Sequence, residues 1–470
     1  MLARLLSRLK TGKLPKDPHR VVVVGGGFGG VYCTQQLKRK PVAVTLLDRR
    51  NFHLFQPLLY QVATGALSPA NIAEPLRAMF ERRRDVEVLL GEVSDVCPER
   101  NRLMLSDGHE VPYDTLVVAC GSTGSYFGND QWADDAPPLK TLEDSLDMRR
   151  RIYMAFERAE RSDCNLERQR LLTFVIVGAG PTGTELAGAV AEISRITLKS
   201  EFRRIDSGDA TVILVQSRDR VLNTFPEELS AEAEDDLREL GVIVRTECRV
   251  VDVQDDHVKI KNKATGDVET IPCHTTLWAA GVQAAPLTTT LAERCGVQQT
   301  RGGQIAVEAD CSVPGHPEIL LVGDAMHMEQ DGEPLPGVAQ VAIQQGKYAA
   351  KLIAARLKGP EAVANLGPFR YLDLGNMATI GKRKAIAETP VMNMHGRLAW
   401  LAWLFVHLVN IIPFRSRILV LIQWGWSYVT NERAARLITE TPATVARKFS
   451  RASEAGHVDA IQEAPLRQSA

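Results

Sequence analysis

The sequence predicts an α/β protein that contains two Rossmann-type dinucleotide-binding domains and ends in an apolar helical region. Two observations predict the repeated unit. A buried strand leads into a G-x-G-x-x-G frame that opens at Gly25, and the same construction returns at Gly178. A third observation predicts the last region, because the almost purely apolar residues 398–414 are followed by a second apolar run, 418–429. The 470 residues are enough for two or three domains with sizeable cores.

The first unit has a strand, a glycine loop, a helix, a second strand and an acid in that order. Residues 21–24 are four valines, typical of a strand buried on both faces. The glycines that follow are Gly25, Gly27 and Gly30. They allow a tight turn, so that a pyrophosphate can lie on the N-terminus of the next helix. The second strand, residues 42–47, ends on Asp48, which is placed to accept a hydrogen bond from a ribose hydroxyl. A glycine-rich loop alone is weak evidence, but this full order predicts a nucleotide site.

The second unit repeats this order about 150 residues later. Its glycines are Gly178, Gly180 and Gly183, and its second strand, residues 210–215, ends at Gln216. Two such units in one chain indicate two nucleotides held against each other. Two nucleotides in this arrangement can pass a hydride from a nicotinamide to a flavin. The alternative is an inert duplicated fold.

Composition excludes some classes of function. The net charge of −1 provides no overall field for nucleic-acid binding. The cysteines are scattered without a C-x-x-C pair, which argues against a disulfide framework, a zinc site or a redox dithiol and favours a reducing compartment. They stand at positions 33, 97, 120, 164, 248, 273, 295 and 311. No cluster of metal ligands is visible, so we expect no metal.

Both ends of the chain differ from the middle. Residues 1–18 form a basic leader, which we interpret as a frayed end, although a surface-seeking amphipathic segment or a targeting peptide stays open. Residues 439–470 form a polar tail.

Weaker patterns fill the space between the two units. Residues 86–96 and 103–113 alternate like an antiparallel ribbon, and residues 242–271 predict a second ribbon. The strand-then-glycine ending DTLVVACG at 114–121 is echoed by TLWAAGV at 276–282. This echo supports a duplicated architecture.

Two later segments point to a ligand. The apolar residues 319–323 deliver Asp324 to the end of a strand, where polar flavin groups would lie, although a helix N-cap is the alternative. Residues 336–350 predict a helix on which Gln340 and Gln344 lie one turn apart. This pair would suit the polar edge of a ring, but a buried, satisfied glutamine is commoner.

The two apolar runs near the C-terminus favour helices that lie in a membrane interface. Neither run has the roughly 20 residues that a spanning helix needs. His407 and Asn410 would also sit badly in the centre of a bilayer. Tryptophan beside arginine is typical of the interface. The tryptophans in this window are Trp400, Trp403, Trp424 and Trp426. A dimer interface or a buried helical hairpin is the alternative.

Taken together, these motifs carry a family resemblance. The segments GGGFGG, FHLFQPLLYQVATG, GAGPTGTELAG, WAAGV, VGDA and PGVAQVAIQQGKYAA, with the tryptophan-rich block, occur in an order that resembles the type II NADH dehydrogenases. These are single-chain NADH:quinone oxidoreductases that do not pump protons. The resemblance covers residues 19–438, and its aromatic and AQVAIQ segments are more specific than either glycine frame.

The resemblance implies a glutathione-reductase-like arrangement of domains. We expect a discontinuous FAD-binding domain at residues 19–165 and 283–370, an NAD(P)H-binding domain at 166–282 and a membrane-anchoring region at 371–438. The residues implied for non-covalent FAD are Gly25, Gly27, Phe28, Gly29, Gly30, Asp48, Arg49, Gly121, Asp324, Ala325, Gln340 and Val341. Those implied for the nicotinamide nucleotide are Gly178, Gly180, Pro181, Thr182, Gly183, Glu185, Gln216, Ala280 and Gly281.

The resemblance also implies a reaction and its partners. Glu185, Gln340 and Gln344 would be catalytic, with Glu185 coupling protons, and quinone would contact Gln340, Ile343, Gln344 and Lys382. The quinone would be ubiquinone or menaquinone, and the protein a homodimer bound to the lipid surface through its C-terminal helices. We expect a respiratory-chain role on the cytoplasmic face of a bacterial inner membrane, in preference to a mitochondrial one.

Two departures from the family pattern bear on specificity. Many members carry a glutamate where this chain has Gln216, and Arg218 follows closely. A neutral glutamine removes repulsion toward a 2′-phosphate, so NADPH is a possible substrate beside NADH. Ile343 stands where some relatives have a histidine, which makes the expected quinone pocket more apolar.

Three other functions share part of this sequence pattern. A disulfide reductase would need a close cysteine pair after the first glycine frame, where only Cys33 stands. A sulfide:quinone oxidoreductase would need paired cysteines, one of them late in the chain, and no cysteine follows Cys311. A nucleotide-responsive regulatory flavoprotein is the alternative from another class, but no motif is eroded.

Overall fold

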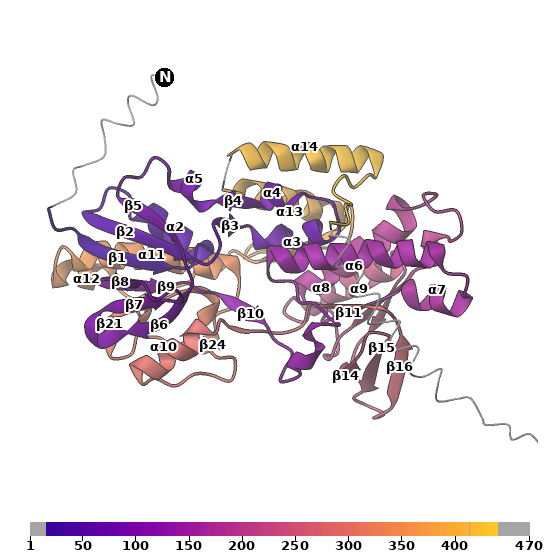
Figure 1. Ribbon diagram of the computed structural model, residues 1–470, viewed down its shortest axis with the longest axis horizontal. Coiled ribbons are helices and arrows are strands. Elements are labelled where there is room, and N and C mark those ends of the chain that lie inside the picture. The colour runs from indigo at the N-terminus through magenta and orange to yellow at the C-terminus, as the bar shows by residue number, and fades with distance from the viewer. Residues whose placement is uncertain (1–15, 413, 440–470) are drawn as a thin grey trace, which may run out of the picture.

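The computed structural model describes residues 16–412 and 414–439. Two α/β lobes lie side by side along the long axis of the molecule (Figure 1). Helices α13 (Gly396–Asn410) and α14 (Phe414–Thr430) pack together along one edge, the upper edge in Figure 1. The expected polar tail and most of the expected basic leader lie outside the described residues.

The first lobe is built on a six-stranded sheet in the order β20-β21-β9-β1-β2-β5. All neighbouring pairs are parallel except β20 with β21. The valines of the first predicted strand are buried in the middle of this sheet, as the sequence pattern requires. Helices α2 (Phe28–Gln36) and α11 (Ala339–Arg356) pack against each other beside it. The strands are β1 (His19–Val24), β2 (Val42–Asp48), β5 (Val86–Leu90), β9 (Thr115–Val118), β20 (Ser312–Val313) and β21 (His316–Leu321).

The second lobe repeats the central part of this sheet. Its four parallel strands lie in the order β13-β12-β11-β17, matching β5-β2-β1-β9 of the first lobe. The strands are β11 (Thr173–Val177), β12 (Thr211–Val215), β13 (Val242–Arg245) and β17 (Thr275–Trp278). Helices α8 (Pro181–Glu192) and α9 (Glu227–Glu239) pack on this sheet. The duplication predicted from the sequence echo is confirmed.

The two repeated strand endings meet between the lobes. After Gly121 and Gly281 the chain enters β10 (Ser122–Gly124) and β18 (Val282–Ala284), which pair antiparallel. Both glycines have positive φ, 69° and 73°, a conformation that disfavours a side chain. This pairing places the ends of the two repeats next to each other.

Both lobes carry the predicted antiparallel ribbon, which has three strands in each lobe and begins later than expected. Residues 86–90 and 242–245 form β5 and β13, which are parallel edge strands of the main sheets. An edge strand is covered less completely than a central one, so its sequence alternates and resembles a ribbon. The antiparallel strands are β6 (Val93–Cys97), β7 (Arg102–Leu105) and β8 (Glu110–Pro112), and β14 (Cys248–Val253), β15 (His257–Asn262) and β16 (Val268–Pro272).

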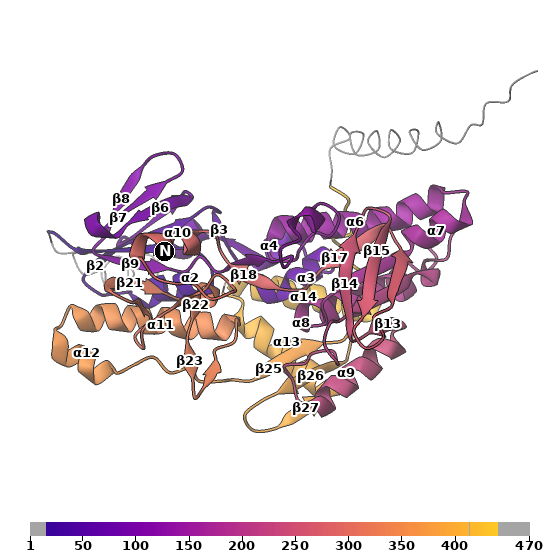
Figure 2. The same ribbon diagram turned by 90° about the horizontal axis from the view of Figure 1, so that it is seen from below.

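The C-terminal region packs on the second lobe. Its antiparallel sheet contacts α8 and α9 and precedes α13 (Figure 2). The sheet consists of β25 (Asn376–Thr379), β26 (Ala385–Glu388) and β27 (Asn393–His395). Trp403 of α13 is fully buried in the same core as Phe174 of the second lobe. The first lobe has a separate core around β1 and β9.

The remaining elements are shorter or connect the lobes. Helix α6 (Leu142–Arg161) stands between the two units and contacts β17 and α3 (Leu59–Ala63). The other helices are η1 (Gln56–Leu58), α4 (Pro69–Ile72), α5 (Leu76–Phe80), η2 (Pro98–Arg100), η3 (Asp130–Ala133), α7 (Asn165–Leu171), η4 (Ile193–Thr197), η5 (Ser207–Asp209), α10 (Leu287–Cys295), η6 (Gly323–Ala325) and α12 (Pro360–Leu366). The other strands are β3 (Phe52–Leu54), β4 (Ala73–Pro75), β19 (Ile305–Ala306), β22 (Met326–His327), β23 (Glu329–Gln330) and β24 (Glu333–Pro334).

Within residues 16–412 and 414–439, no helix has both the length and the apolar character needed to cross a membrane. The domain boundaries given above stay predictions.

Candidate functional site

A cavity of about 1020 Å³ is lined by both lobes and by the C-terminal region. The predicted site residues on its wall are Gly25, Gly27, Phe28, Gly29, Asp48, Arg49, Gly121, Asp324, Pro181, Thr182 and Glu185. The predicted residues that do not line it are Gly30, Ala325, Gln340, Val341, Gly178, Gly180, Gly183, Gln216, Ala280, Gly281, Ile343, Gln344 and Lys382. The two glycine loops therefore open toward one shared space, although only part of each predicted set faces it.

The first glycine loop turns from β1 into α2 at one wall of this cavity. Gly25 has φ +107°, and a Cβ on Gly30 would collide with the carbonyl oxygen of Gly25. Both positions therefore need glycine for the helix to start this close to the strand. Gly27 has open space where a side chain would stand. The backbone N–H groups at the start of α2 suit a pyrophosphate.

Asp48 holds this loop in place from the end of β2. Its Oδ2 accepts a hydrogen bond from the Gly26 N–H at 2.5 Å, and its Oδ1 accepts one from the Arg50 N–H at 2.6 Å. Burial raises the pKa of Asp48, while the Gly26 and Arg50 hydrogen bonds favour the charged form. Each oxygen keeps a further lone pair for a ribose hydroxyl.

Asp324 lies on the wall between the strand ends of the first lobe. The Ser122 hydroxyl donates to its Oδ2 at 2.5 Å, and the Lys140 ammonium group lies 3.7 Å from the same oxygen. Ser122 and Lys140 also line the cavity. The structure thus adds a hydroxyl and a cation to the predicted carboxylate.

The second glycine loop has the same construction as the first. Gly178 has φ +97°, and a Cβ on Gly183 would collide with the Gly178 carbonyl oxygen. Ala280 packs directly against Gly178. At the end of the next strand, Gln216 is buried whereas Arg218 is exposed. Among the described residues, Arg218 forms no ion pair.

Glu185 is the buried carboxyl group of the site. It stands in the first two turns of α8 with 8% of its surface exposed, and it lines the cavity. Burial raises its pKa to about 8. The Thr379 N–H donates to its Oε1 at 3.4 Å, and the Trp403 indole nitrogen lies nearby without a hydrogen bond of normal geometry. The carboxyl is therefore protonated at neutral pH and can donate a proton.

A chain of hydrogen bonds joins the surroundings of Glu185 to helix α14. The hydroxyls of Tyr60 and Thr379 are 3.0 Å apart, and the Gln61 amide donates to Tyr60 at 3.1 Å. The Trp424 indole N–H donates to Gln61 Oε1 at 2.7 Å. Burial is the main cause that raises the pKa of Tyr60 well above its usual value, and the nearby Glu185 adds a smaller increase. These hydrogen bonds fix the orientation of the polar side chains next to Glu185.

The residues predicted to bind quinone are more scattered. Ile343 is buried, and Gln340 is half-buried just beyond Ala339, which lines the cavity. The Gln344 amide makes two hydrogen bonds with the backbone of Leu372, at 2.8 and 3.0 Å. Lys382 donates from Nζ to the Ser427 carbonyl oxygen at 2.7 Å. The polar ends of Gln344 and Lys382 are thus occupied by the protein itself.

Several wall residues were not proposed from the sequence. His407 lies in an apolar run whose pattern indicates a membrane-interface helix, and Lys140 stands in a plain segment before α6. Tyr60 belongs to an aromatic segment without a clear period. Lys140 carries no local signal, and the segments that contain Tyr60 and His407 contribute to the family resemblance without predicting a cavity role for either residue. The tertiary fold brings all three to the cavity.

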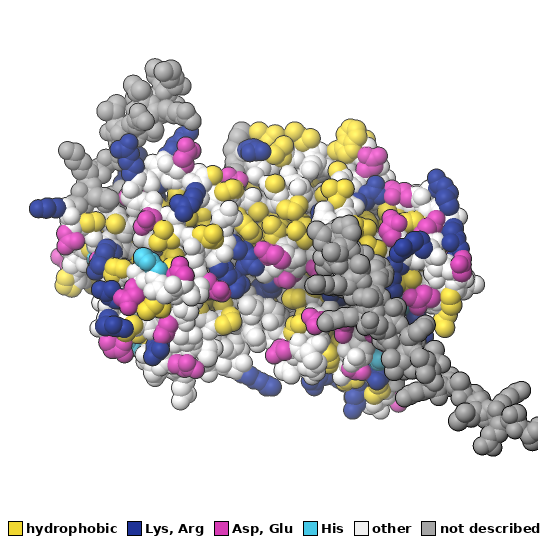
Figure 3. Space-filling view, in the orientation of Figure 1, with side chains coloured by type: hydrophobic (Ala, Val, Ile, Leu, Met, Phe, Trp, Pro, Cys, Tyr) yellow, Lys and Arg dark blue, Asp and Glu magenta, His cyan; other side chains and the backbone are white. Residues whose placement is uncertain are grey.

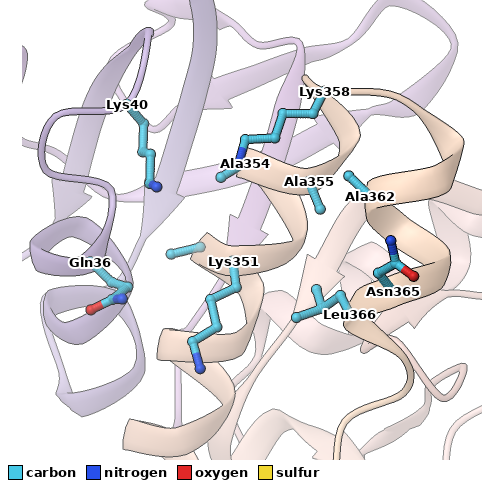
Figure 4. Close-up of a pocket in the computed structure, with 10 residues that line it drawn as sticks. Gln36, Lys40, Lys351, Ala354, Ala355, Lys358, Ala362, Asn365 and Leu366 are labelled. Atoms are coloured by element: carbon cyan, nitrogen blue, oxygen red, sulfur yellow. The ribbon is translucent and has the colours of Figure 1, made fainter.

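A second hollow, of about 280 Å³, lies beside α11 and α12 (Figure 4). Its side chains include Lys40, Lys351 and Lys358, which form no ion pair among the described residues. None of the predicted site residues lies there.

Comparison with known proteins places these features in a wider group. Residues 19–346 match the pyridine nucleotide-disulphide oxidoreductase family, and residues 374–430 match the NDH2 C-terminal domain. Type II NADH:quinone oxidoreductase Ndh of Mycobacterium tuberculosis is 41% identical over 445 residues, covering 94% of each chain. NdhA of the same organism is 43% identical over 425 residues, covering 90% of this chain and 89% of its own.

Solved structures share the fold. NDH2 from Plasmodium falciparum in complex with NADH has a TM-score of 0.82 at 19% identity, covering 90% of this chain and all of its own. The sulfide:quinone oxidoreductase of Aquifex aeolicus has a TM-score of 0.66 at 17% identity, covering 90% and 93%. The predicted α/β fold is therefore confirmed.

Proposed function

The chain belongs to the type II NADH:quinone oxidoreductase family, and we propose that it oxidises NADH and reduces a membrane quinone without pumping protons. One observation carries this proposal. Pro181, Thr182 and Glu185 of the second glycine unit line the same cavity as Gly25 and Asp48 of the first. Two dinucleotides bound to these units would meet in that cavity.

The first lobe fits FAD. The start of α2 supplies N–H groups for the pyrophosphate, and Asp48 supplies acceptors for a ribose. Gly27 and Gly121 leave open space where side chains would obstruct a ligand. Asp324, with Ser122 and Lys140, adds polar groups for the middle of the molecule. When bound, FAD supplies two-electron chemistry between NADH and quinone.

The protein's own contribution is to orient the substrates and supply a proton. Reduction of a quinone consumes two electrons and two protons, so a proton donor beside the cavity is required. Glu185 meets this need, because its carboxyl is buried, protonated at neutral pH and on the cavity wall. Tyr60 and Thr379 keep the surrounding polar groups in place.

The quinone is expected to enter from the C-terminal region. Asn376, Met377 and His407 of this region line the cavity, so the cavity extends from the glycine loops to α13. The family-implied contacts at Gln340 and Ile343 lie next to this wall, on the first turns of α11. Because Gln344 and Lys382 are bonded elsewhere, we assign them a supporting role.

Helices α13 and α14 present an apolar surface suited to lipid. Hydrophobic side chains gather on the face formed by α14 (Figure 3). The exposed apolar residues of the two helices include Leu398, Leu401, Phe405, Val409, Ile418, Leu421, Ile422, Trp426 and Val429. Arg415 is exposed beside them and Arg383 lies over the Tyr428 ring. Apolar groups flanked by arginine favour an anionic lipid surface.

We place this surface on the cytoplasmic face of a bacterial inner membrane, where NADH is available to the second lobe. We expect the quinone to be ubiquinone or menaquinone. Both have a head group whose ring carries two carbonyl groups, and the same cavity would accept either. The homodimer implied by the family resemblance stays a prediction that light scattering in detergent will test.

The proposed function is tested by separating the two halves of the reaction. Purified FAD-loaded protein is mixed with NADH, and then with NADPH, in a stopped-flow instrument, and a water-soluble quinone follows. We expect rapid loss of the oxidised flavin absorbance with NADH and its return with quinone. Bleaching without return would exclude quinone reduction, and no bleaching would favour a regulatory nucleotide-binding protein.

A sulfide:quinone oxidoreductase is the second candidate because it shares the fold. Such an enzyme requires paired cysteines beside the flavin. All eight cysteines of this chain lie in the described residues, and none of them forms a disulfide. Sulfide should therefore fail to bleach the flavin.

A further inference from the structure

His407 is a polar side chain that helix α13 contributes to the cavity wall. The family motifs assign it no role in the cavity, because it lies in the tryptophan-rich block, for which the resemblance implies only membrane anchoring. Its surroundings are aromatic. The imidazole is stacked on Trp403, with ring centroids 4.0 Å apart and an angle of 24°, and Phe55 approaches with its ring at 84° and 6.3 Å. These two rings fix the orientation of the imidazole.

The hydrogen bond of Nδ1 decides where the proton of this ring lies. Nδ1 is 2.8 Å from the carbonyl oxygen of Trp403. A carbonyl oxygen can only accept, so Nδ1 carries the hydrogen and donates it. Burial lowers the pKa of His407 to about 4, so the ring is neutral at physiological pH. Nε2 therefore presents a lone pair and no hydrogen.

Nε2 has no hydrogen-bond partner among the described residues. Nε2 of His407 is also not sealed inside the protein, whereas Nε2 of His53 is buried without a partner. Because the side chain lines the cavity, a molecule inside the cavity can reach this lone pair. Nε2 is thus an acceptor that faces the cavity and that no protein group uses, so a donor from a ligand can bind it.

We propose that His407 is a substrate-positioning residue whose Nε2 accepts a hydrogen bond from a hydroxyl of the quinol. The inference rests on the proposed function, because a quinol forms in this cavity only if the chain reduces quinone. His407 takes no electron and no proton in this role. The quinone gains two electrons and two protons, and one of the new O–H groups then points to Nε2.

This contact discriminates between the two redox states of the substrate. A quinone offers only carbonyl acceptors to the ring nitrogen, and two acceptors cannot form a hydrogen bond. A quinol offers hydroxyl donors. His407 thus favours the reduced state, and the ring that it stacks on, Trp403, also lies near the proton donor Glu185. The nicotinamide carboxamide also carries N–H donors, so the test includes a separate reading for NADH.

Three substitutions separate this role from a structural one. His407→Gln keeps an acceptor near the position of Nε2. His407→Asn keeps a donor near Nδ1 for the Trp403 carbonyl but lacks the acceptor, and His407→Phe lacks both. Asn410→Ala on the same helix removes an amide that donates to Val406 and does not line the cavity, and it serves as the control.

The measurements use FAD-loaded holoenzyme, a short-chain ubiquinone and the corresponding ubiquinol. We determine the NADH dependence of flavin bleaching, the KM for ubiquinone and the inhibition constant of added ubiquinol. Ubiquinol binding without turnover is followed anaerobically by quenching of tryptophan fluorescence, since Trp403 stacks on His407. The unmodified protein tests the proposed function, because its reduced flavin must be reoxidised by ubiquinone.

We expect His407→Phe and His407→Asn to weaken ubiquinol binding about fivefold, which is about 1 kcal/mol for one hydrogen bond. Bleaching by NADH and the KM for ubiquinone should change less than twofold, and His407→Gln should bind ubiquinol as the unmodified protein does. Unchanged ubiquinol binding in the Phe and Asn variants would overturn the proposal, as would an altered NADH dependence. Equal weakening in all four variants, Asn410→Ala included, would also overturn it.

Discussion

At the scale of single residues, burial decides the chemistry of this site. Glu185 belongs to a helix whose sequence marks it only as part of a nucleotide-binding unit. Its position against β25 and Trp403 removes water and stabilises the protonated carboxyl. His407 shows the opposite effect, because the same kind of burial stabilises the neutral imidazole. One cavity therefore contains a protonated acid and an unprotonated base at neutral pH.

Glu185→Gln tests the acid. A pKa raised to about 8 means that the carboxyl is protonated below pH 8 and ionised above it. The rate of reoxidation by quinone should therefore fall above pH 8 in the unmodified protein. Glu185→Gln should lower this rate about 100-fold and abolish the fall with pH, with the flavin spectrum retained. Stopped-flow reoxidation between pH 6 and 10 measures both effects.

Glu361→Gln, at an exposed position on α12, is the control for this series. It should leave the rate and the pH profile unchanged. A Glu185→Gln protein with normal reoxidation, or with the same pH profile as the unmodified protein, would contradict the assignment of Glu185 as proton donor.

Gln216 is the residue expected to control the choice of nucleotide. It is buried at the end of β12, and the exposed Arg218 follows it. Gln216→Glu would introduce a carboxylate that repels a 2′-phosphate, so we expect kcat/KM for NADPH to fall at least tenfold. The value for NADH should change less than threefold. Arg218→Ala should lower NADPH use in the same direction, and equal effects on both nucleotides would contradict this role.

At the scale of elements, α13 and α14 each combine two functions. The inner face of α13 supplies Trp403 to the core and His407 to the cavity, and the inner face of α14 buries Val420 in the same core. The outer faces of both helices carry exposed apolar side chains. Such a division explains why both helices are apolar on nearly every side. It also places the lipid surface close to the cavity wall, so that a quinone has only a short path to travel.

Charges on the outer faces should release the protein from lipid. We expect Phe405→Asp combined with Ile422→Asp, whose side chains are 68% and 61% exposed, to reduce binding to anionic vesicles at least tenfold. Activity with a water-soluble quinone should stay within twofold of the unmodified protein. Vesicle sedimentation measures the binding. Leu166→Asp on α7, at a 57% exposed position, is the control, and equal loss in that variant would contradict a specific lipid surface.

At the scale of the whole molecule, a C-terminal strap ties distant parts of the chain together. We define the strap as residues 431–438, directly after α14. Arg433 forms an ion pair with Glu192 of α8 at 2.9 Å, with both side chains 5% exposed, and also donates to the Thr64 carbonyl oxygen at 3.3 Å. The Ala435 N–H donates to the Gly65 carbonyl oxygen at 3.0 Å. The strap thus joins the second lobe to the segment that follows α3.

Arg433→Met should therefore destabilise the fold strongly. It leaves the Glu192 carboxylate buried without its partner, which costs about 3–5 kcal/mol. Arg436→Met removes the exposed pair with Glu201 on the same strap and should cost under about 1 kcal/mol. Urea unfolding of the FAD-loaded proteins compares the two. Similar unfolding midpoints for both variants would show that the strap does not depend on the buried pair.

The sequence by itself determined the two nucleotide units, because their strands, glycine frames and terminal residues follow from local spacing. The glycine positions and Asp48 could be predicted since β-α-β geometry places them at one strand edge. The C-terminal helices could be predicted from continuous apolar runs. The family resemblance predicts the role of Glu185.

Only the tertiary structure decided which of these residues share a cavity and in which protonation state. Lys140, Tyr60 and His407 come from segments far apart in the chain and carry no periodic signal, yet they line one wall. Gln344 and Lys382 were predicted for quinone, but partners elsewhere in the chain bind their polar ends. The pKa values of Glu185 and His407 likewise depend on burial by α13 and β25. Local spacing carries no information on these long-range contacts, because each depends on where the lobes and the C-terminal region pack.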